Sequence, residues 1–356
     1  MGALGRQLGP EAIRKVHERV VEIARENKIV TGRKMRVDTT VVETNIHYPT
    51  DSSLLGDGVR VLTRVMKKIA KVAGDAGAKL RDRSRSVKLR VLAIARASRN
   101  KTEKGQEKLK QSYVKLLEAT SRVVGQAKKF SREIAERVKR GNRTVLSRAK
   151  KELDKMIPRV QQVMRQTRER GLQGNTRAEE KILSLFEPET EVVRKGKAHK
   201  PNEFGKLVKI QEAEKQIITD YQVCEQRPAD STLLVPSLEQ HVEQFGRAPE
   251  VVAADPGFFS AANEAKAEEM GVRRVSIPSH ATKSPARKER QKQRWFKKLQ
   301  KWRTGCEGCI SVLKQRHGLD RCRYKGLDGM KRWVGLGVIA DNLIHIGSHL
   351  AEQQQD

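Results

Sequence analysis

Hydrophobic positions repeat with a helical period in some parts of the chain and with a period of two in others. Residues 10–27 carry apolar side chains at helical spacing behind Pro10, which predicts a short amphipathic helix. The β-branched run at residues 34–46 alternates and predicts a strand. Near the other end, the apolar stretch 334–350 predicts a closing helix, in which Asp341 and His345 are interpreted as structural.

Between about residues 49 and 177 glycine and proline become sparse and lysine and arginine dense. The apolar residues that keep helical spacing here are Leu62, Val65, Met66, Ile69, Val72, Tyr113, Leu116, Leu117, Val123 and Val124. Glycine-containing breaks fall near residues 74–77, 141–142 and 171–174. This segment therefore predicts a helical hairpin or small bundle inserted after the first strand.

From residue 189 the alternation of apolar and polar residues that is typical of strands returns. Three short runs alternate, of which the second and third predict a hairpin, and a helix at 234–245 and a strand at 251–254 follow. Strands mixed with helices predict an α/β fold. The expected divisions are an N-terminal helix at residues 1–30, a core at 31–48 plus 186–356, and a basic helical insertion at 49–185.

The chain is strongly basic. Its 74 Lys and Arg against 43 Asp and Glu give a net charge of +31, and residues 49–186 contain 36 basic and 14 acidic residues, a surplus of 22. Such a field favours polyanions, although ribosomal and membrane-surface proteins are basic too. A charge-rich helix is often only a solvated face, but this surplus favours a DNA-facing insertion. With 4% aromatic residues, duplex-backbone binding is favoured over base stacking.

The absence of long apolar segments and the small number of cysteines limit the possible cellular compartments and metal sites. It has no run of about 18 apolar residues, and its N-terminus has no signal-peptide core. Four irregularly spaced cysteines suit a reducing cytoplasm better than a disulfide scaffold. Cys306 and Cys309 form a CxxC pair that suggests either a zinc site completed by Cys322 and His317, or small packing residues on a helix.

Three acidic residues stand where phosphodiester chemistry needs them. Asp38 lies in the first predicted strand, Asp255 directly follows the strand at 251–254, and Glu307 lies on a predicted helix. Singly, an Asp at a strand end is often a turn former and a charged helix stripe often a solvated ion-pair ladder. Arg303, Glu307 and Lys314, however, share one helix face within about 40°. Such carboxylates can hold two Mg²⁺ ions about 3.5–4 Å apart around a phosphodiester.

The order Asp, Asp, Arg-x3-Glu-x6-Lys resembles the insertion-sequence transposases of the DDE superfamily, in the ISNCY-like branch. Residues 38–58 resemble their first catalytic strand and loop, residues 251–278 their second-Asp strand, helix and strand, and residues 305–329 their glutamate helix and its exit. Where the family signature has Tyr three residues before the Arg, this chain has Gln300.

The resemblance implies a ribonuclease H-like fold, a five-stranded mixed sheet flanked by helices, here with a large basic helical insertion. It implies DNA transposition in which Asp38, Asp255 and Glu307 hold two Mg²⁺ ions, with Mn²⁺ as a substitute, and Arg303 and Lys314 contact phosphates. The implied partner is double-stranded DNA, both element ends and target. A homodimer on DNA and a cytoplasmic, nucleoid-associated location in a bacterium are compatible with it, and a membrane is not involved.

Further basic residues are candidates for DNA contact. Residues 279–303 contain ten basic residues and one acid, and their place just before the glutamate helix favours Lys297, Lys298 and Lys301 as a clamp on the scissile strand. Lys200, in the loop that enters the predicted hairpin, is a further candidate. The aromatic residues Trp295, Phe296 and Trp302 would either pack under the helix or stack on a flipped base. Asp230 is a reserve ligand, although an N-cap role suits it better.

The first catalytic Asp arrives at position 38 with one helix before it, whereas related transposases carry an N-terminal helical domain that recognises the terminal repeats. Either the insertion recognises DNA, or the chain is a truncated copy that binds DNA without catalysis. Intact acidic residues favour the enzyme, and the missing domain favours the alternative. Inverted repeats flanking the gene would discriminate between the two.

Overall fold

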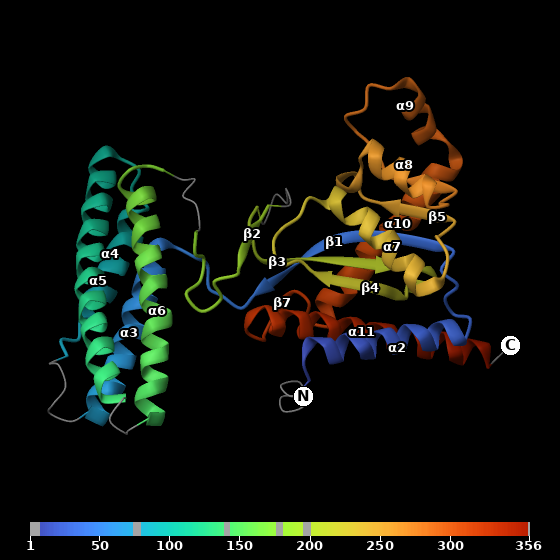
Figure 1. Cartoon of the computed structure of the whole chain (residues 1–356). Helices are drawn as coiled ribbons and strands as arrows, with labels where there is room; N and C mark the ends of the chain where they lie inside the picture. The colour runs from blue at the N-terminus through green and yellow to red at the C-terminus, as the bar shows by residue number, and fades with distance from the viewer. Residues whose placement is uncertain (1–7, 74–79, 139–142, 176–180, 195–200, 355–356) are drawn as a thin grey trace. The chain divides into compact units, whose positions relative to one another are not determined.

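The chain folds into two compact units. The computed structural model describes residues 8–73, 80–138, 143–175, 181–194 and 201–354. One unit contains Met1–Asn45 and Glu191–Asp356 and holds the sheet; the other, Ile46–Thr190, is helical (Figure 1). No helix in the described ranges is long and apolar enough to cross a membrane.

A mixed sheet forms the centre of the first unit. Its strands are β1 (Lys34–Thr44), β2 (Glu191–Val193), β3 (Glu203–Glu212), β4 (Ile218–Val223), β5 (Val251–Ala254), β6 (Arg274–Ser276) and β7 (Arg321–Cys322). Strand β3 runs antiparallel to β1, β2 and β4, whereas β5 and β7 are parallel to β1 and β6 is parallel to β5. The predicted hairpin is confirmed by β3 and β4, and the predicted strand 251–254 by β5.

Seven strands take part in this sheet, so the expected number of five was wrong. The two additional strands are short: β2 pairs with the start of β3, and β7 pairs with the end of β1 through Glu43↔Arg321 and Thr44↔Cys322. The first alternating run of the sequence, which starts at residue 189, already indicated β2, whereas the two residues of β7 are too few to display an alternating pattern.

Helices cover both faces of the sheet. Alternation along β1 directs Val37 and Val41 into an apolar cluster with α7 (Leu234–Phe245) and α8 (Ala261–Glu269). Val42 joins the opposite cluster with α10 (Arg294–Gln315) and α11 (Gly326–Gln353), which follow the short helix α9 (Pro285–Lys292). Helix α2 (Pro10–Glu26) lies along α11 (Figure 1). The predicted helices at 10–27 and 234–245 are confirmed, while the closing helix begins eight residues before the predicted 334.

The second unit is a bundle of helices around its own core. Its helices are α3 (Asp51–Ala73), α4 (Ser84–Ala97), α5 (Glu103–Val138) and α6 (Arg143–Gly171). Most of the spaced apolar residues are buried in one cluster, but Val72 is 43% exposed. The predicted break near 171–174 is confirmed by the end of α6, whereas those near 74–77 and 141–142 lie outside the described residues.

Candidate active site

Strand β1 carries Asp38 on the sheet face that α10 covers. Asp38 is buried at 8% exposure, and its Oδ1 accepts a hydrogen bond from the Thr39 backbone N–H at 2.7 Å. The Arg303 guanidinium on α10 reaches Asp38 Oδ2 from Nη1 at 3.3 Å. An ionised carboxylate buried this far needs a partner, and here a cation supplies it.

Asp255 lies beside Asp38 because their strands are parallel neighbours. Val37 of β1 pairs with Ala254 of β5, and the next residue on each strand is the aspartate. Adjacent strands run about 4.8 Å apart. The backbone of Asp255 is extended, and the 3₁₀ turn at Pro256–Phe258 begins immediately after it. The half-buried Asp255 therefore marks the point where β5 stops.

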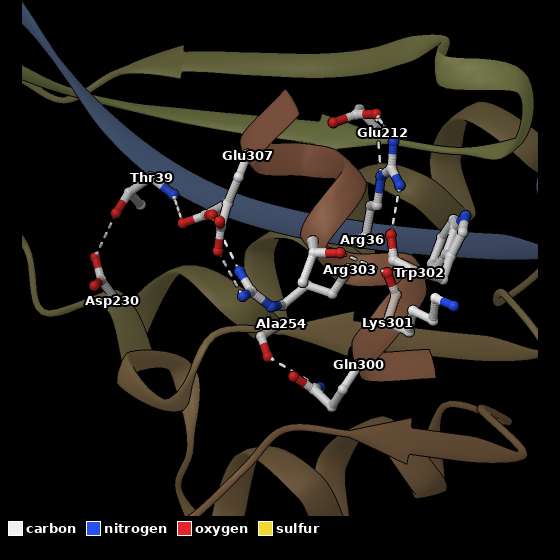
Figure 2. A network of polar contacts seen from close by, with 12 residues as sticks. Arg36, Thr39, Glu212, Asp230, Ala254, Gln300, Lys301, Trp302, Arg303 and Glu307 are labelled. Carbon is white, nitrogen blue, oxygen red and sulfur yellow. Dashed lines mark hydrogen bonds and ion pairs between the residues drawn. The ribbon is translucent and has the colours of Figure 1, made fainter. Parts of the chain in front are cut away.

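Glu307 approaches from α10, and Arg303 lies between it and Asp38. Arg303 Nη2 donates to Glu307 Oε1 at 2.7 Å (Figure 2). Its Nη1 faces Asp38, so one guanidinium bridges two of the candidate carboxylates. Burial opposes the charge on Arg303, but the Glu307 hydrogen bond and the charges of Asp38, Asp255 and Glu307 together raise its pKa above the usual value. All three acids thus act on the same cation.

Gln300 fixes α10 against the ends of two strands. It lies one turn before Arg303, and its side-chain amide donates to the Ser276 carbonyl of β6 at 2.7 Å and to the Ala254 carbonyl of β5 at 3.5 Å. The second carbonyl belongs to the residue before Asp255. Gln300 therefore positions α10 against both strands.

A buried ion pair that the sequence did not reveal supports the helix from below. Arg36 on β1 pairs with Glu212 directly across on β3, and both side chains are at most 5% exposed. Arg36 also donates to the Trp302 carbonyl at 2.6 Å, and its guanidinium lies 5.0 Å from the Trp302 ring centroid. The approach is close at Gly305, where an added Cβ would lie 2.3 Å from Arg36 Nη1.

The CxxC pair belongs to this buried layer. Burial, followed by the negative charge of Glu212, raises the pKa of the Cys306 and Cys309 thiols. The other residues that the zinc alternative would need have separate contacts: Cys322 Sγ lies 3.4 Å from the Tyr324 carbonyl, and His317 lies 3.3 Å from Asp341. Cys309 and Cys322 pack in the apolar cluster under α10 and α11.

Asp230 does not cap a helix, and in this respect the expected role was wrong. The residue before it, Ala229, holds the cap position of the 3₁₀ turn at Asp230–Leu233, and its backbone carbonyl accepts from Thr232. Asp230 Oδ1 instead accepts a hydrogen bond from the Thr39 hydroxyl at 3.2 Å (Figure 2). The aspartate therefore connects to β1 one residue beyond Asp38.

The remaining candidates for DNA contact are distributed unevenly. Lys314 is half-buried two turns beyond Glu307 on the same helix face. Lys297, Lys298 and Lys301 are exposed at the start of α10, and Lys200 lies outside the described residues. Of the three aromatic residues, Phe296 is buried, whereas Trp295 and Trp302 are half-buried.

The acidic residues suit a hard divalent cation by their chemistry, although Arg303 occupies their centre. Asp38, Asp255 and Glu307 offer only oxygen donors, which Mg²⁺ prefers. Within the described ranges, no three His, Cys, Asp or Glu side chains lie close enough together to hold a metal ion. The arrangement is therefore one in which an internal cation neutralises two of the carboxylates.

Comparison with protein families gives a match to part of the chain. Residues 263–346 match the model of a transposase DDE domain. This stretch is less than half of the chain; it contains Arg303, Glu307 and Lys314 but neither Asp38 nor Asp255. No curated protein and no solved structure matches the chain.

Proposed function

We propose that this chain is an insertion-sequence transposase of the ISNCY-like DDE branch, which cleaves DNA strands and joins them to a target. The observation that carries the proposal is the convergence of three acids on one guanidinium: Asp38 and Asp255 at neighbouring positions of parallel strands, and Glu307 on the helix across from them. The residues that match a transposase DDE domain, 263–346, include that helix.

The strand order supports a ribonuclease H-like core. Leaving aside the two short strands, the sheet runs β4-β3-β1-β5-β6; β3 is antiparallel to both β4 and β1, whereas β1, β5 and β6 are parallel to one another. An antiparallel meander followed by helix-linked parallel strands and a late helix is the order that the family resemblance implies. It sets Asp38 on the central strand and Asp255 next to it.

Asp38, Asp255 and Glu307 would hold the Mg²⁺ ions. When bound, such ions stabilise charge on the attacking and leaving oxygens of a phosphodiester. Arg303 contacts two of these three carboxylates, those of Asp38 and Glu307. A metal held by Asp38 and Glu307 would therefore compete with the two ion pairs of Arg303, and the guanidinium would then be available for a phosphate.

Arg303 and Lys314 would position the DNA. A guanidinium is always charged and presents a planar set of donors that fits a phosphate in a bidentate manner. Within the described part of the chain, Arg303 Nε is buried without a hydrogen-bond partner, so an acceptor there would satisfy it. Lys314 supplies a point charge farther along the same helix face. The nucleophile, water or a DNA 3′-hydroxyl, would then attack the phosphorus in line and lose its proton, while the opposite P–O bond breaks and the departing 3′-oxygen leaves as a hydroxyl.

One observation favours a second candidate, a non-catalytic DNA-binding protein descended from a transposase. Arg303 already neutralises Asp38 and Glu307, as a cation would in a site that no longer binds metal. In either case the partner is double-stranded DNA. The enzyme would act on the nucleoid in a bacterial cytoplasm and, by family resemblance, as a homodimer on DNA.

Replacing Glu307 with Gln tests the enzyme. The change keeps the shape of the side chain but removes one ligand charge, so nicking of supercoiled plasmid bearing candidate element ends, with Mg²⁺ or Mn²⁺, should fall more than about 100-fold. DNA binding should persist or rise, because repulsion of phosphate is relieved. The matched control is Glu289→Gln, an exposed acid on α9 that loses the same charge away from the site.

Equal nicking by wild type and Glu307→Gln would place the cleavage elsewhere and refute the mechanism. A thermal-shift titration with Mn²⁺ separates the two candidates. A ligand that binds only the folded state raises the melting temperature, so the wild type should be stabilised by Mn²⁺ and Glu307→Gln less so. DNA binding without nicking and without stabilisation would favour the non-catalytic candidate.

A further inference from the structure

Helix α10 has a second charged face, away from the candidate active site. Arg294, Lys297, Lys298 and Lys301 are spaced by three, four and seven residues, so they line one side of the helix. At 100° per residue this side lies about 150° around the helix from Arg303, Glu307 and Lys314. In Figure 2 the Lys301 side chain points away from Glu307. We call these four residues the α10 basic face.

A shallow hollow accompanies this face. It has a volume of about 860 Å³ and is lined by Gln293, Trp295 and the four cations of the α10 basic face. Trp295 contributes a half-buried aromatic wall, and the guanidinium of Arg274 lies 5.5 Å from its ring centroid. No acidic residue lines the hollow, so a ligand there would meet positive charge and the Trp295 ring.

Among the described residues, none forms an ion pair with the cations of the α10 basic face. Four of the six other cations in residues 279–303 have acidic partners: Arg287 and Arg290 pair with acids of α8, Lys292 pairs with Glu289, and Arg303 pairs within the candidate site. For the four cations of the α10 basic face the described part of the chain contains no ion pair. Because like charges so close together repel one another, binding of an external polyanion would reduce the electrostatic repulsion among these four cations.

The distribution of net charge points to the same place. Of the surplus of 31 positive charges, 22 belong to residues 49–186 and nine to residues 279–303, so the rest of the chain is balanced. The sheet-containing unit thus concentrates its excess charge in the segment that contains the α10 basic face. A field focused in this way attracts a polyanion to one surface rather than to the whole unit.

We propose that the α10 basic face binds the backbone of a DNA duplex segment other than the strand at Asp38, Asp255 and Glu307. Seven residues of helix span about 10 Å, and a DNA strand advances about 3.4 Å per phosphate, so the face would contact about three phosphates. Lys297, Lys298 and Lys301 therefore hold a separate stretch of DNA rather than clamp the scissile strand. This inference rests on the proposed function for its substrate, although it is tested by binding alone.

The test is a DNA-binding titration against salt, without divalent metal. Lys297→Gln/Lys298→Gln/Lys301→Gln should lower the slope of log K against log salt by about 2–3, because each neutralised phosphate contributes about 0.9. The matched control removes three exposed lysines from elsewhere in the same unit, Lys15→Gln/Lys34→Gln/Lys325→Gln, and should leave the slope close to the wild-type value. Equal slopes for the two triple variants would overturn the proposal.

Whether the two surfaces hold different DNA is tested by combination. Lys314 lies on the same face of α10 as Arg303 and Glu307. In a variant that combines Lys314→Ala with the triple substitution, the fold-loss of DNA affinity should equal the product of the two separate fold-losses, because independent contacts are additive in free energy. A clearly smaller combined loss would show that both surfaces contact the same phosphates and would overturn the separate segment. Both measurements are of binding, so a failure of nicking leaves this test intact.

Trp295 provides a direct signal from the hollow. A short duplex should change the Trp emission of the wild type, and Trp295→Phe should lose most of that change, since Trp302 and Trp333 lie outside the hollow. Poly-glutamate should compete poorly with duplex DNA at equal charge concentration. Equal competition would identify the face as a general polyanion surface and overturn the assignment to DNA.

Discussion

Gly305 and Gly308 stand one turn apart on α10 but have different surroundings. A Cβ on Gly305 would meet Arg36 Nη1 at 2.3 Å, while nothing lies within 4 Å of one on Gly308. Arg36 has little room to retreat, because it is buried, paired with Glu212 and bonded to the Trp302 carbonyl. The glycine at 305 thus lets the helix approach the ion pair that supports the site.

Gly305→Ala should therefore destabilise the protein by about 1–3 kcal/mol, through overpacking and disturbance of a buried ion pair. Gly308→Ala is the matched control and should stabilise it by about 0.5–1 kcal/mol, since alanine favours the helix and the added methyl meets no atom. Urea unfolding followed by circular dichroism measures both. A Gly305→Ala protein as stable as Gly308→Ala would show that Arg36 moves without cost.

Single residues differ in how far the sequence reveals them. Asp38, Asp255 and Glu307 could be selected because carboxylates at a strand, a strand end and a helix face form a known pattern. The ion pair of Arg36 and Glu212 could not be predicted from the sequence, because the two residues are 176 positions apart and are brought together only by the pairing of β1 with β3. Charged residues in a strand suggest a solvent-facing side, and only the folded sheet shows that here they face each other in the interior.

At the scale of elements, helix α10 has three chemically different sides. One side packs into the core through Phe296, Cys309 and Leu313. A second side presents Arg303, Glu307 and Lys314, and a third is the α10 basic face. An amphipathic pattern identifies the first side, but the two charged sides are distinguished only by the angle between them and by what each contacts in the fold.

Lys314→Ala tests the role of the second side. Its loss should weaken DNA binding and lower the salt slope by about 0.9, because one phosphate contact disappears. Nicking at saturating DNA should fall less than in Glu307→Gln, since the lysine positions the backbone and holds no metal. The neighbouring exposed Gln315→Ala serves as control and should change neither quantity. A loss of nicking as large as that of Glu307→Gln would assign Lys314 a direct part in the chemistry.

Element boundaries were predictable where a pattern runs for several turns. Residues 10–27, 234–245 and 251–254 have long or well-punctuated patterns and agree with α2, α7 and β5. The separation of α4 from α5 was missed, because it depends on local hydrogen bonds: the Thr102 N–H donates to Asn100 Oδ1, and the Thr102 hydroxyl accepts from the Gly105 N–H. Such a cap occupies three or four residues and leaves the hydrophobic period almost intact.

At the scale of the whole molecule, each unit has its own core. The cluster of the helical unit draws only on residues between Leu54 and Leu185, and the clusters around the sheet draw on the other unit. The sequence indicated the helical segment by its loss of strand texture and its charge surplus. Charge and periodicity describe composition, and the grouping of apolar residues into separate cores follows from the fold.

Deleting residues 46–190 should therefore leave the sheet-containing unit folded. Glu43 of β1 and Glu191 of β2 both pair with Gly205 from opposite sides of β3, so they are two strand spacings apart, about 10 Å. Because an extended residue spans about 3.3–3.6 Å, a six-residue Gly/Ser linker can connect Asn45 to Glu191. The expected product unfolds cooperatively on heating and has more strand signal per residue in circular dichroism.

The same deletion tests which unit dominates DNA binding. It removes a helical segment with a surplus of 20 positive charges, so affinity and salt slope should both fall. The slope that remains should depend on the α10 basic face and vanish largely when Lys297, Lys298 and Lys301 are replaced in the shortened chain. Residues 46–190 expressed alone provide the reciprocal measurement and should bind duplex DNA with a steep slope. An unchanged slope in the shortened chain would show that the helical unit does not face DNA, and its charge would then be a solvated surface.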